Sequence, residues 1–355
     1  MKKILVRIAA LVAVVAAIVV LVILARPGEP AGGKLLVQVV GGQPGAWNLK
    51  ERMDGFTEAV AGTDIALTKL LYNNENPDTA LQMAESAITA HPDLRGFFCS
   101  NAFGGPGAAL AIKDAIKRGR IKPGQIHVVA FDTTEDILDF IDQGIIDCTL
   151  AQNTREMGRI SIEKLLEFAR QYRQKKAFQR PPKGEDIIDT GVTVVWPKDV
   201  PKYRAKPAGG KPATQPKPPA AGAGGPKLRF ALVPKSIGHP YWEGVREGMD
   251  ETARRLGVEA VFQGPPEASI EEQLKVIEGL IAEGYDGIGI SPNDPDAVKG
   301  VIERAMAKGI AVVTFDSDAP ESERLVYIGT DNREGGRVGA RAMIKLLEAK
   351  KPAGG

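Results

Sequence analysis

The stretch GIGISPNDPDAVKGVIERAMAKGIAVVTFD, residues 287–316, decides the fold class of this chain. It opens with the apolar run GIGIS (287–291), closes with AVVTFD (311–316), and carries an amphipathic helical pattern near 294–308 between them. A strand, a helix and a second strand in this order form a βαβ unit, which joins two parallel strands. AVVTF is apolar at consecutive positions, which suits a strand covered on both faces of its sheet. The stretch therefore predicts an α/β protein.

The same alternation of short apolar strands and amphipathic helices fills two segments, 34–205 and 227–355. Between them, residues 206–226 read KPAGGKPATQPKPPAAGAGGP and contain no large apolar side chain, which predicts a linker without a core. We therefore predict two doubly wound parallel-sheet lobes. The expected strands are 35–40, 65–72, 96–100, 127–132 and 147–152, followed by 228–233, 259–263, 287–291, 311–316 and 326–331.

The N-terminus indicates export. Residues 8–25 form a run of 18 apolar residues, and about 20 suffice to span a bilayer as a helix. A cleavable signal peptide has a shorter apolar core and a small-residue cleavage site, and no clean A-x-A motif follows here. We therefore expect residues 1–26 to form a signal anchor, with a cleaved signal peptide as the alternative. Lys2, Lys3 and Arg7 precede the span, so the rest of the chain would lie on the extracytoplasmic face of the cytoplasmic membrane.

The composition excludes several functional classes. The chain has 46 basic and 44 acidic side chains, whereas a nucleic-acid-binding domain shows a marked basic excess. Two cysteines and three histidines leave little material for a zinc site. We expect no metal, no cofactor and no nucleic-acid partner.

Polar side chains follow the expected strands, where ligands bind in doubly wound sheets. They supply carboxylates, amides and hydroxyls, but no nucleophile, base and metal ligands gathered as an enzyme would need. The sequence therefore predicts a binding site without catalysis. The candidate positions are 41–47, 100–101, 132–133, 152–153, 234–239, 291–293, 316–318 and 331–332.

Several motifs resemble one known family. Over 34–200 and 227–350 the chain is similar to the ribose-binding-protein-like solute-binding proteins, which are periplasmic receptors of sugar ABC importers. The resemblance implies the type 1 periplasmic binding protein fold, in which two lobes close around a sugar by a hinge motion. The motifs are KERMDGF (50–56), TAHPDLRGFFCSN (89–101), VVAFDTTED (128–136), TLAQNTREMG (149–158), TFDSDAP (314–320) and YIGTDNREGGRVG (327–339).

The order of the two segments departs from the family pattern. In the family, the segment resembling 227–350 comes first and the segment resembling 34–200 follows it. The chain thus resembles a circularly permuted member, with 206–226 joining the family's two ends. The resemblance places the crossings between lobes near Gln152–Asn153, Thr190–Val195 and Asp331. One lobe would combine 227–330 with 154–187, and the other 34–152 with 332–355.

The family pattern also implies ligand contacts in the lobe built on 227–330. Tyr241 and Trp242 fall where the family places aromatic rings that stack on the apolar face of a sugar. His239 matches a polar sugar-contacting position. Asp316 matches a carboxylate that accepts sugar hydroxyl groups, and charge-assisted hydrogen bonds are the stronger kind. Ser317 stands where the family often has arginine, which departs from the ribose pattern. A core position for one ring, and helix capping by the polar residues, are the alternative roles.

In the other lobe, Asn101, Asp132 and Gln152 fall on contact positions, and each could instead cap a helix. Lys50 aligns with a family arginine in KERMDGF, although lysine lacks the bidentate fork. Asn48 is expected to shape the same side of the pocket.

Two further residues of this lobe differ from the ribose pattern or add to it. Glu75 lies near a position where ribose receptors use an aromatic residue, and this swap favours a more polar ligand. Arg52 is the second basic residue of KERMDGF.

The family fold places one strand between those of Cys99 and Cys148, which puts the two sulfur atoms beyond disulfide reach. We expect two buried free thiols.

The leading functional hypothesis is a membrane-anchored receptor that binds a monosaccharide or similar polyhydroxylated solute and delivers it to an ABC permease. The alternative is a sensor that presents ligand occupancy to a sensor kinase or chemoreceptor. Sugar-responsive transcription regulators share the fold but carry an N-terminal helix-turn-helix, where this chain has an apolar span.

Overall fold

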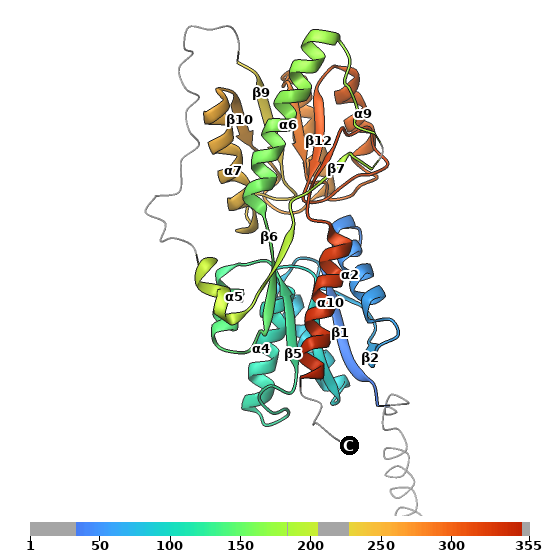
Figure 1. Cartoon of the computed structure of the whole chain (residues 1–355), viewed down its shortest axis with the longest axis vertical. Coiled ribbons are helices and arrows are strands. Elements are labelled where there is room, and N and C mark those ends of the chain that lie inside the picture. Colours follow the sequence, from blue (N-terminus) through green and yellow to red (C-terminus); the bar gives the residue numbers. More distant parts are fainter. Residues whose placement is uncertain (1–32, 183, 205–226, 350–355) are drawn as a thin grey trace, which may run out of the picture.

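The computed structural model describes residues 33–182, 184–204 and 227–349. The expected signal anchor at 1–26 and the expected linker at 206–226 lie outside the described residues. None of the helices in the described part has the length and apolar character needed to cross a membrane. The described residues form two α/β lobes, one above the other in Figure 1, as the alternation of strands and helices predicts.

Lobe 1, the lower lobe in Figure 1, is built on a sheet with the strand order β2-β1-β4-β5-β6-β8, with β3 also paired to β1. The strands are parallel except β8, which runs antiparallel to β6 at the edge. Helices α2 and α10 cover one face, and α3, α4 and α5 cover the other. Its elements are β1 (Leu35–Gly41), α2 (Trp47–Val60), β2 (Ile65–Leu67), β3 (Leu71–Tyr72), α3 (Pro77–Ala90), β4 (Leu94–Cys99), α4 (Gly104–Lys117), β5 (His127–Phe131), α5 (Glu135–Asp142), β6 (Cys148–Gln152), β8 (Val192–Val195), the 3₁₀ helix η1 (Pro197–Lys202) and α10 (Asn332–Glu348).

Lobe 2 is built on a parallel sheet with the order β10-β9-β11-β12-β13-β7. Helices α6 and α7 cover one face, and α8 and α9 cover the other. Its elements are α6 (Thr154–Lys175), β7 (Ile187–Asp189), β9 (Arg229–Val233), α7 (Tyr241–Leu256), β10 (Glu259–Phe262), α8 (Ile270–Ala282), β11 (Gly287–Ile290), α9 (Lys299–Ala307), β12 (Ala311–Phe315) and β13 (Tyr327–Gly329).

The described chain crosses between the lobes three times, from β6 to α6, from β7 to β8 and from β13 to α10. These crossings and the resulting division of segments between the lobes confirm the prediction. Two of the crossing segments are hydrogen-bonded side by side. The Thr190 N–H donates to the Gly329 carbonyl at 2.8 Å, and the Asp331 N–H donates to Asp189 Oδ1 at 2.9 Å. The crossings from β7 to β8 and from β13 to α10 therefore lie side by side in the hinge.

Two elements differ from the expected bounds. The expected strand at 65–72 divides into β2 and β3, because the Gln38 side chain donates to a backbone carbonyl between them at 2.9 Å. The helix expected near 294–308 begins only at Lys299, because the Asp294 carboxylate accepts two backbone N–H groups and holds a turn.

The helices that follow the crossings pack unusually close to their partners. A Cβ atom on Gly336 of α10 would lie 2.0 Å from the Arg52 carbonyl oxygen of α2. In lobe 2, a Cβ on Gly158 of α6 would lie 1.9 Å from the Val245 carbonyl oxygen of α7. Glycine is required where backbones approach this closely. Helices α10 and α6 are therefore held tightly against the helices that begin at the space between the lobes.

Cys99 in β4 and Cys148 in β6 are buried free thiols with β5 between their strands, which confirms the prediction. Their side chains belong to the cores on opposite faces of the sheet. Burial raises the pKa of both thiols, so they stay protonated.

Candidate functional site

A cavity of about 470 Å³ lies between the lobes and is lined by residues of both. This volume is in the range of small-molecule sites. Across the described residues, no group of three or more His, Cys, Asp or Glu side chains is arranged to hold a metal ion. Eight of the ten predicted contact residues line the cavity, namely Asn48, Asn101, Asp132, Gln152, His239, Tyr241, Trp242 and Asp316.

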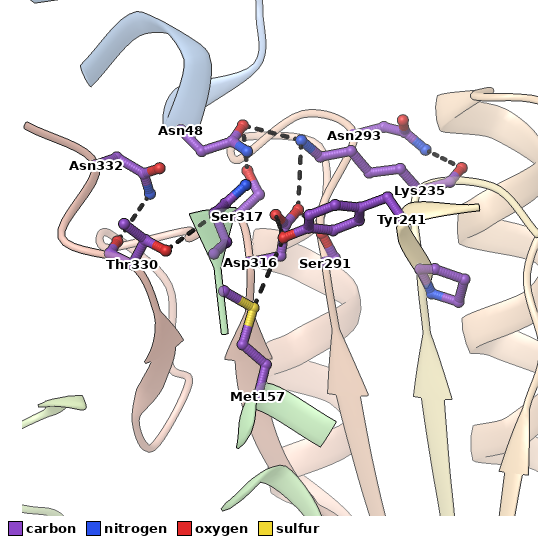
Figure 2. Close-up of polar contacts among 12 residues, drawn as sticks. Asn48, Met157, Lys235, Tyr241, Ser291, Asn293, Asp316, Ser317, Thr330 and Asn332 are labelled. Atoms are coloured by element: carbon purple, nitrogen blue, oxygen red, sulfur yellow. Dashed lines mark hydrogen bonds and ion pairs between the residues drawn. The ribbon is translucent and has the colours of Figure 1, made fainter. Parts of the chain in front are cut away.

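Asp316 is the centre of a hydrogen-bond network in lobe 2 (Figure 2). It follows β12 with a left-handed φ of 60° and is 3% exposed. Its Oδ1 accepts from the Tyr241 hydroxyl at 2.7 Å, and its Oδ2 accepts from the Ser291 hydroxyl at 2.8 Å. The Lys235 Nζ lies 3.7 Å from the same Oδ2. Burial and the adjacent carboxylate raise the pKa of Tyr241, so its hydroxyl stays protonated and the Asp316 carboxylate is held in one orientation.

Aromatic rings from the first turn of α7 form the neighbouring wall. Tyr241 and Trp242 pack edge to face with ring centroids 4.8 Å apart, and both line the cavity. The backbone N–H of Tyr241 donates to His239 Nδ1 at 3.0 Å, so the ring proton of a neutral His239 lies on Nε2. The His239 ring also packs against Phe103 of lobe 1, with centroids 5.0 Å apart. This wall therefore combines apolar ring surface with polar groups.

Arg52 and Asp132 meet through Gln152 on the lobe 1 side. The Arg52 guanidinium donates to Gln152 Oε1 at 2.7 Å, and Gln152 Nε2 donates to Asp132 Oδ1 at 2.8 Å. Arg52 is 2% exposed and also lies over the Phe131 ring, 4.3 Å from its centroid. Burial raises the pKa of Asp132 against the opposing effect of the Arg52 charge. Gln152 also accepts from the Thr330 hydroxyl at 3.0 Å, which links this wall to the hinge.

Asn101 contacts the start of a helix and also lines the cavity. Its Oδ1 accepts from the N–H of Gly104, the first residue of α4, at 3.1 Å. Its amide also exchanges two hydrogen bonds of 3.0 Å with buried Asn73. Asn101 therefore fixes the start of α4 and presents the rest of its amide to the cavity.

Direct contacts join the lobes beside the cavity (Figure 2). The Lys235 ammonium of lobe 2 donates to Asn48 Oδ1 of lobe 1 at 2.9 Å. The Ser317 hydroxyl lies 3.4 Å from the same oxygen. Trp47 packs edge to face on Tyr327, with centroids 5.6 Å apart. The lobes therefore meet in a closed arrangement.

Two predicted contact residues lie outside the cavity lining. The Lys50 side chain is 62% exposed and forms an ion pair with Asp54, whereas Arg52 lines the cavity. Ser317 is buried behind the turn that carries Asp316, and its hydroxyl faces Asn48. Helix α2 turns Lys50 outward, and the turn after β12 directs Ser317 toward the contact between the lobes.

Lys235 and Arg52 line the cavity but are absent from the contact residues predicted from the sequence. Lys235 is the second residue after β9 and lies within the stretch 234–239, so the strand-end rule already marked its position. Arg52 shares a helix face with Leu49 and Met53, both buried. The spacing of three and four residues from Leu49 to Arg52 and Met53 places Arg52 on the apolar face of the helix and Lys50 off it.

A family model described as "Periplasmic binding protein domain" matches residues 20–172 and 230–355. The chain belongs to this family. It is similar to the D-allose-binding periplasmic protein of Escherichia coli (strain K12), with 30% identity over 129 residues, 34% of this chain and 42% of that protein. It is also similar to the ribose import binding protein RbsB of Bacillus subtilis (strain 168), with 26% identity over 121 residues, 34% of this chain and 39% of that protein. The matches span about two fifths of the length of these curated relatives.

Solved periplasmic binding proteins share the fold over nearly the whole chain. An ABC transporter solute-binding protein from Bacillus halodurans C-125 with bound myo-inositol has a TM-score of 0.57 at 13% identity, covering 91% of this chain and 92% of that one. A solute-binding protein from Agrobacterium vitis with bound D-fucose has a TM-score of 0.56 at 13% identity, covering 89% and 90%.

Proposed function

We propose that this periplasmic binding protein is an extracytoplasmic receptor for a monosaccharide or similar polyhydroxylated solute. The observation that carries the proposal is the cavity between the lobes, where ring surface stands beside several hydrogen-bonding groups. A sugar has an apolar C–H face that packs on a ring and hydroxyl groups that need polar partners. The names of the relatives and the bound polyols of the structural neighbours support this ligand class.

We propose the cavity-lining residues as the ligand contacts. Arg52 replaces Lys50 in this set, and Lys235 joins it. Ser317 would act indirectly, by contacting the cavity residue Asn48. Asp318 holds the turn of Ser317 in place, because each of its carboxylate oxygens accepts a hydrogen bond from the Arg324 guanidinium at 2.7 Å.

The partner that we propose is the permease of an ABC importer, which would receive the ligand when the lobes open. Support comes from the relatives, one of which is named an import binding protein. We further propose that residues 1–26 anchor the receptor in the cytoplasmic membrane. A sensor kinase partner remains the alternative for the same receptor.

The chain order is proposed to be a circular permutation of the family order. Support comes from the described ends of the chain. Strand β1 begins and α10 ends in lobe 1, so joining them would restore a helix-to-strand connection within one lobe.

A thermal-shift screen tests the receptor function. Residues 30–355, which contain every described element, are melted with pentoses, hexoses and polyols. A ligand that binds only the folded state adds about 2.7 kcal/mol at 100 times its Kd, which raises Tm by several degrees. A sharp transition that no member of the panel moves would contradict the proposal.

A further inference from the structure

The cavity is lined by more negative than positive side chains. Charges in a closed cleft are poorly screened by water, so an imbalance there matters more than it would on the surface. Two cations and four carboxylates line it. The cations belong to Arg52 and Lys235, and the carboxylates to Glu75, Asp132, Glu267 and Asp316.

Each cation is already matched by one carboxylate. The Lys235 ammonium lies 3.7 Å from Asp316 Oδ2. Arg52 faces Asp132 through the two hydrogen bonds of Gln152, and its charge opposes the rise that burial causes in the pKa of Asp132. These four charges therefore balance, and the excess lies with the other two carboxylates.

Of the two remaining carboxylates, only that of Glu75 is partly shielded from solvent. Glu267 is exposed, so water screens its charge. Glu75 is half-buried, and among the described residues its carboxylate has no hydrogen-bond or ion-pair partner. A positive charge on a ligand in the cavity could pair with this carboxylate.

The backbone holds Glu75 in this position. Asn74 and Glu75 both have a left-handed backbone, with φ of 53° and 56°. The Glu75 N–H donates to the side chain of Asn73, which is fully buried, at 3.0 Å. The left-handed backbone is common for asparagine but uncommon for glutamate, and such uncommon conformations cluster at ligand-binding sites.

The carboxylate lies over Gly42, beside another cavity residue. Its Oε1 is 2.2 Å from the point that a Cβ on Gly42 would occupy, and Asn101 Nδ2 is 2.8 Å from the same point. The missing side chain at Gly42 leaves the space that Glu75 uses. The negative charge of Glu75 therefore stands next to an amide that can bind a ligand hydroxyl.

We propose that the receptor selects a polyhydroxylated ligand that carries an ammonium group, an amino sugar, and that Glu75 recognises its charge. This inference rests on the proposed receptor function. The ammonium supplies the charge that the cavity lacks, while the hydroxyl groups meet the amides and Asp132.

Calorimetric titration of the full chain in mild detergent tests the inference with matched ligands. The probes are D-glucosamine, D-galactosamine and D-mannosamine, each against its neutral parent sugar and its N-acetyl form, at a pH where the amine is protonated. We expect at least one amino sugar to bind about tenfold more tightly than both neutral forms. In Glu75→Gln, which keeps the shape of the side chain and removes its charge, this preference disappears, so that the amino sugar binds no more tightly than its neutral parent.

Asp78→Asn is the matched control, because it removes the same charge from an exposed position at the start of α3, outside the cavity lining. It should leave the preference unchanged. A neutral solute that binds as tightly as every amino sugar overturns the amino-sugar inference and leaves the receptor function standing. A preference that persists in Glu75→Gln overturns the role of Glu75. A folded protein that binds no sugar, polyol or amino sugar overturns the receptor function, and this inference with it.

Discussion

At the residue scale, the rotation of helix α2 determines which basic side chain reaches the cavity. Successive residues of an α-helix are rotated by about 100°, so Lys50 and Arg52 point to nearly opposite sides. Lys50 faces solvent, whereas Arg52 donates to the Ser100 carbonyl at 2.9 Å and to Asn332 Oδ1 at 2.8 Å. Arg52 therefore joins α2 to a strand end and to the start of α10.

We expect Arg52→Met to lower the free energy of unfolding by about 3 kcal/mol, because buried acceptors lose their donor. Lys50→Met should change it by less than about 0.5 kcal/mol, as is usual for an exposed site. Urea unfolding of the two variants measures both values. Equal losses in the two variants would contradict the assignment of Arg52 as the inward residue.

Strand ends could be predicted from the sequence better than side-chain directions. Asp132, Gln152 and Asp316 stand at the carboxyl ends of runs predicted as buried strands, so the strand-end rule found them. Ser317 follows Asp316 in a turn whose left-handed backbone reverses the direction of the next side chain, and no residue pattern signals this reversal. The pairing of Lys235 with Asn48 also depends on how the two lobes meet.

We expect the charge of Asp132 to favour ligand binding and to lower the stability of the folded protein. Burial raises the pKa of its carboxyl group above the ordinary value of 3.8, so the folded state holds the proton more tightly than the unfolded state. The contribution of Asp132 to stability therefore falls as pH rises from 3.8 through the raised value. Asp132→Asn cannot ionise, so its stability does not fall with pH in this way. Its side-chain oxygen can still accept a hydrogen bond from Gln152.

We expect Asp132→Asn to be more stable than the wild type at neutral pH, and the difference to vanish below the ordinary pKa. Ligand affinity should fall, because the charged acceptor is gone. Chemical unfolding across a pH series measures the first effect, and titration with the ligand found by thermal shift measures the second. A stability difference that grows toward acid would show that the sign is wrong.

At the scale of elements, close helix packing connects each hinge crossing to the cavity. Helix α10 begins at the crossing from β13 and packs on α2, which carries Asn48 and Arg52. The approach depends on Gly336, which lies against the Arg52 carbonyl oxygen. The sequence predicts both helices, but the short distance between them depends on which glycines lie at the contact. Besides Gly336, Gly55 of α2 is one of them, because a Cβ there would lie 1.9 Å from the Arg333 carbonyl oxygen of α10.

Gly336→Ala should lower the free energy of unfolding by about 2 kcal/mol, although alanine is the better helix former, because the backbones must move apart. Gly279 in α8 is the control, since a Cβ there would meet no atom within 4 Å. Gly279→Ala should raise stability by up to about 1 kcal/mol. Differential scanning calorimetry distinguishes the two signs, and a stabilising Gly336→Ala would contradict the close approach.

At the scale of the whole molecule, the two described ends beside residues 205–226 belong to different lobes (Figure 1). Arg204 is tied to lobe 1 through Glu135, Asp139 and Asp142 of α5. Lys227 precedes β9, whose far end is the one that faces the cavity. At about 3.3 Å per residue, the chain from Lys227 to the cavity end of β9 covers roughly 20 Å. Residues 205–226 can extend to about 70 Å, which is ample for this span.

Replacing residues 205–226 by four residues should therefore prevent the two halves of one chain from pairing. Four residues extend to about 14 Å, less than the span along β9 alone. Segment 34–204 of one chain would then pair with segment 227–349 of another, which gives a swapped dimer. A Gly/Ser segment of the native length is the control and should keep the monomer. Light scattering after size-exclusion chromatography reports the mass, and a stable monomer with the four-residue connection would refute this path of the chain between the lobes.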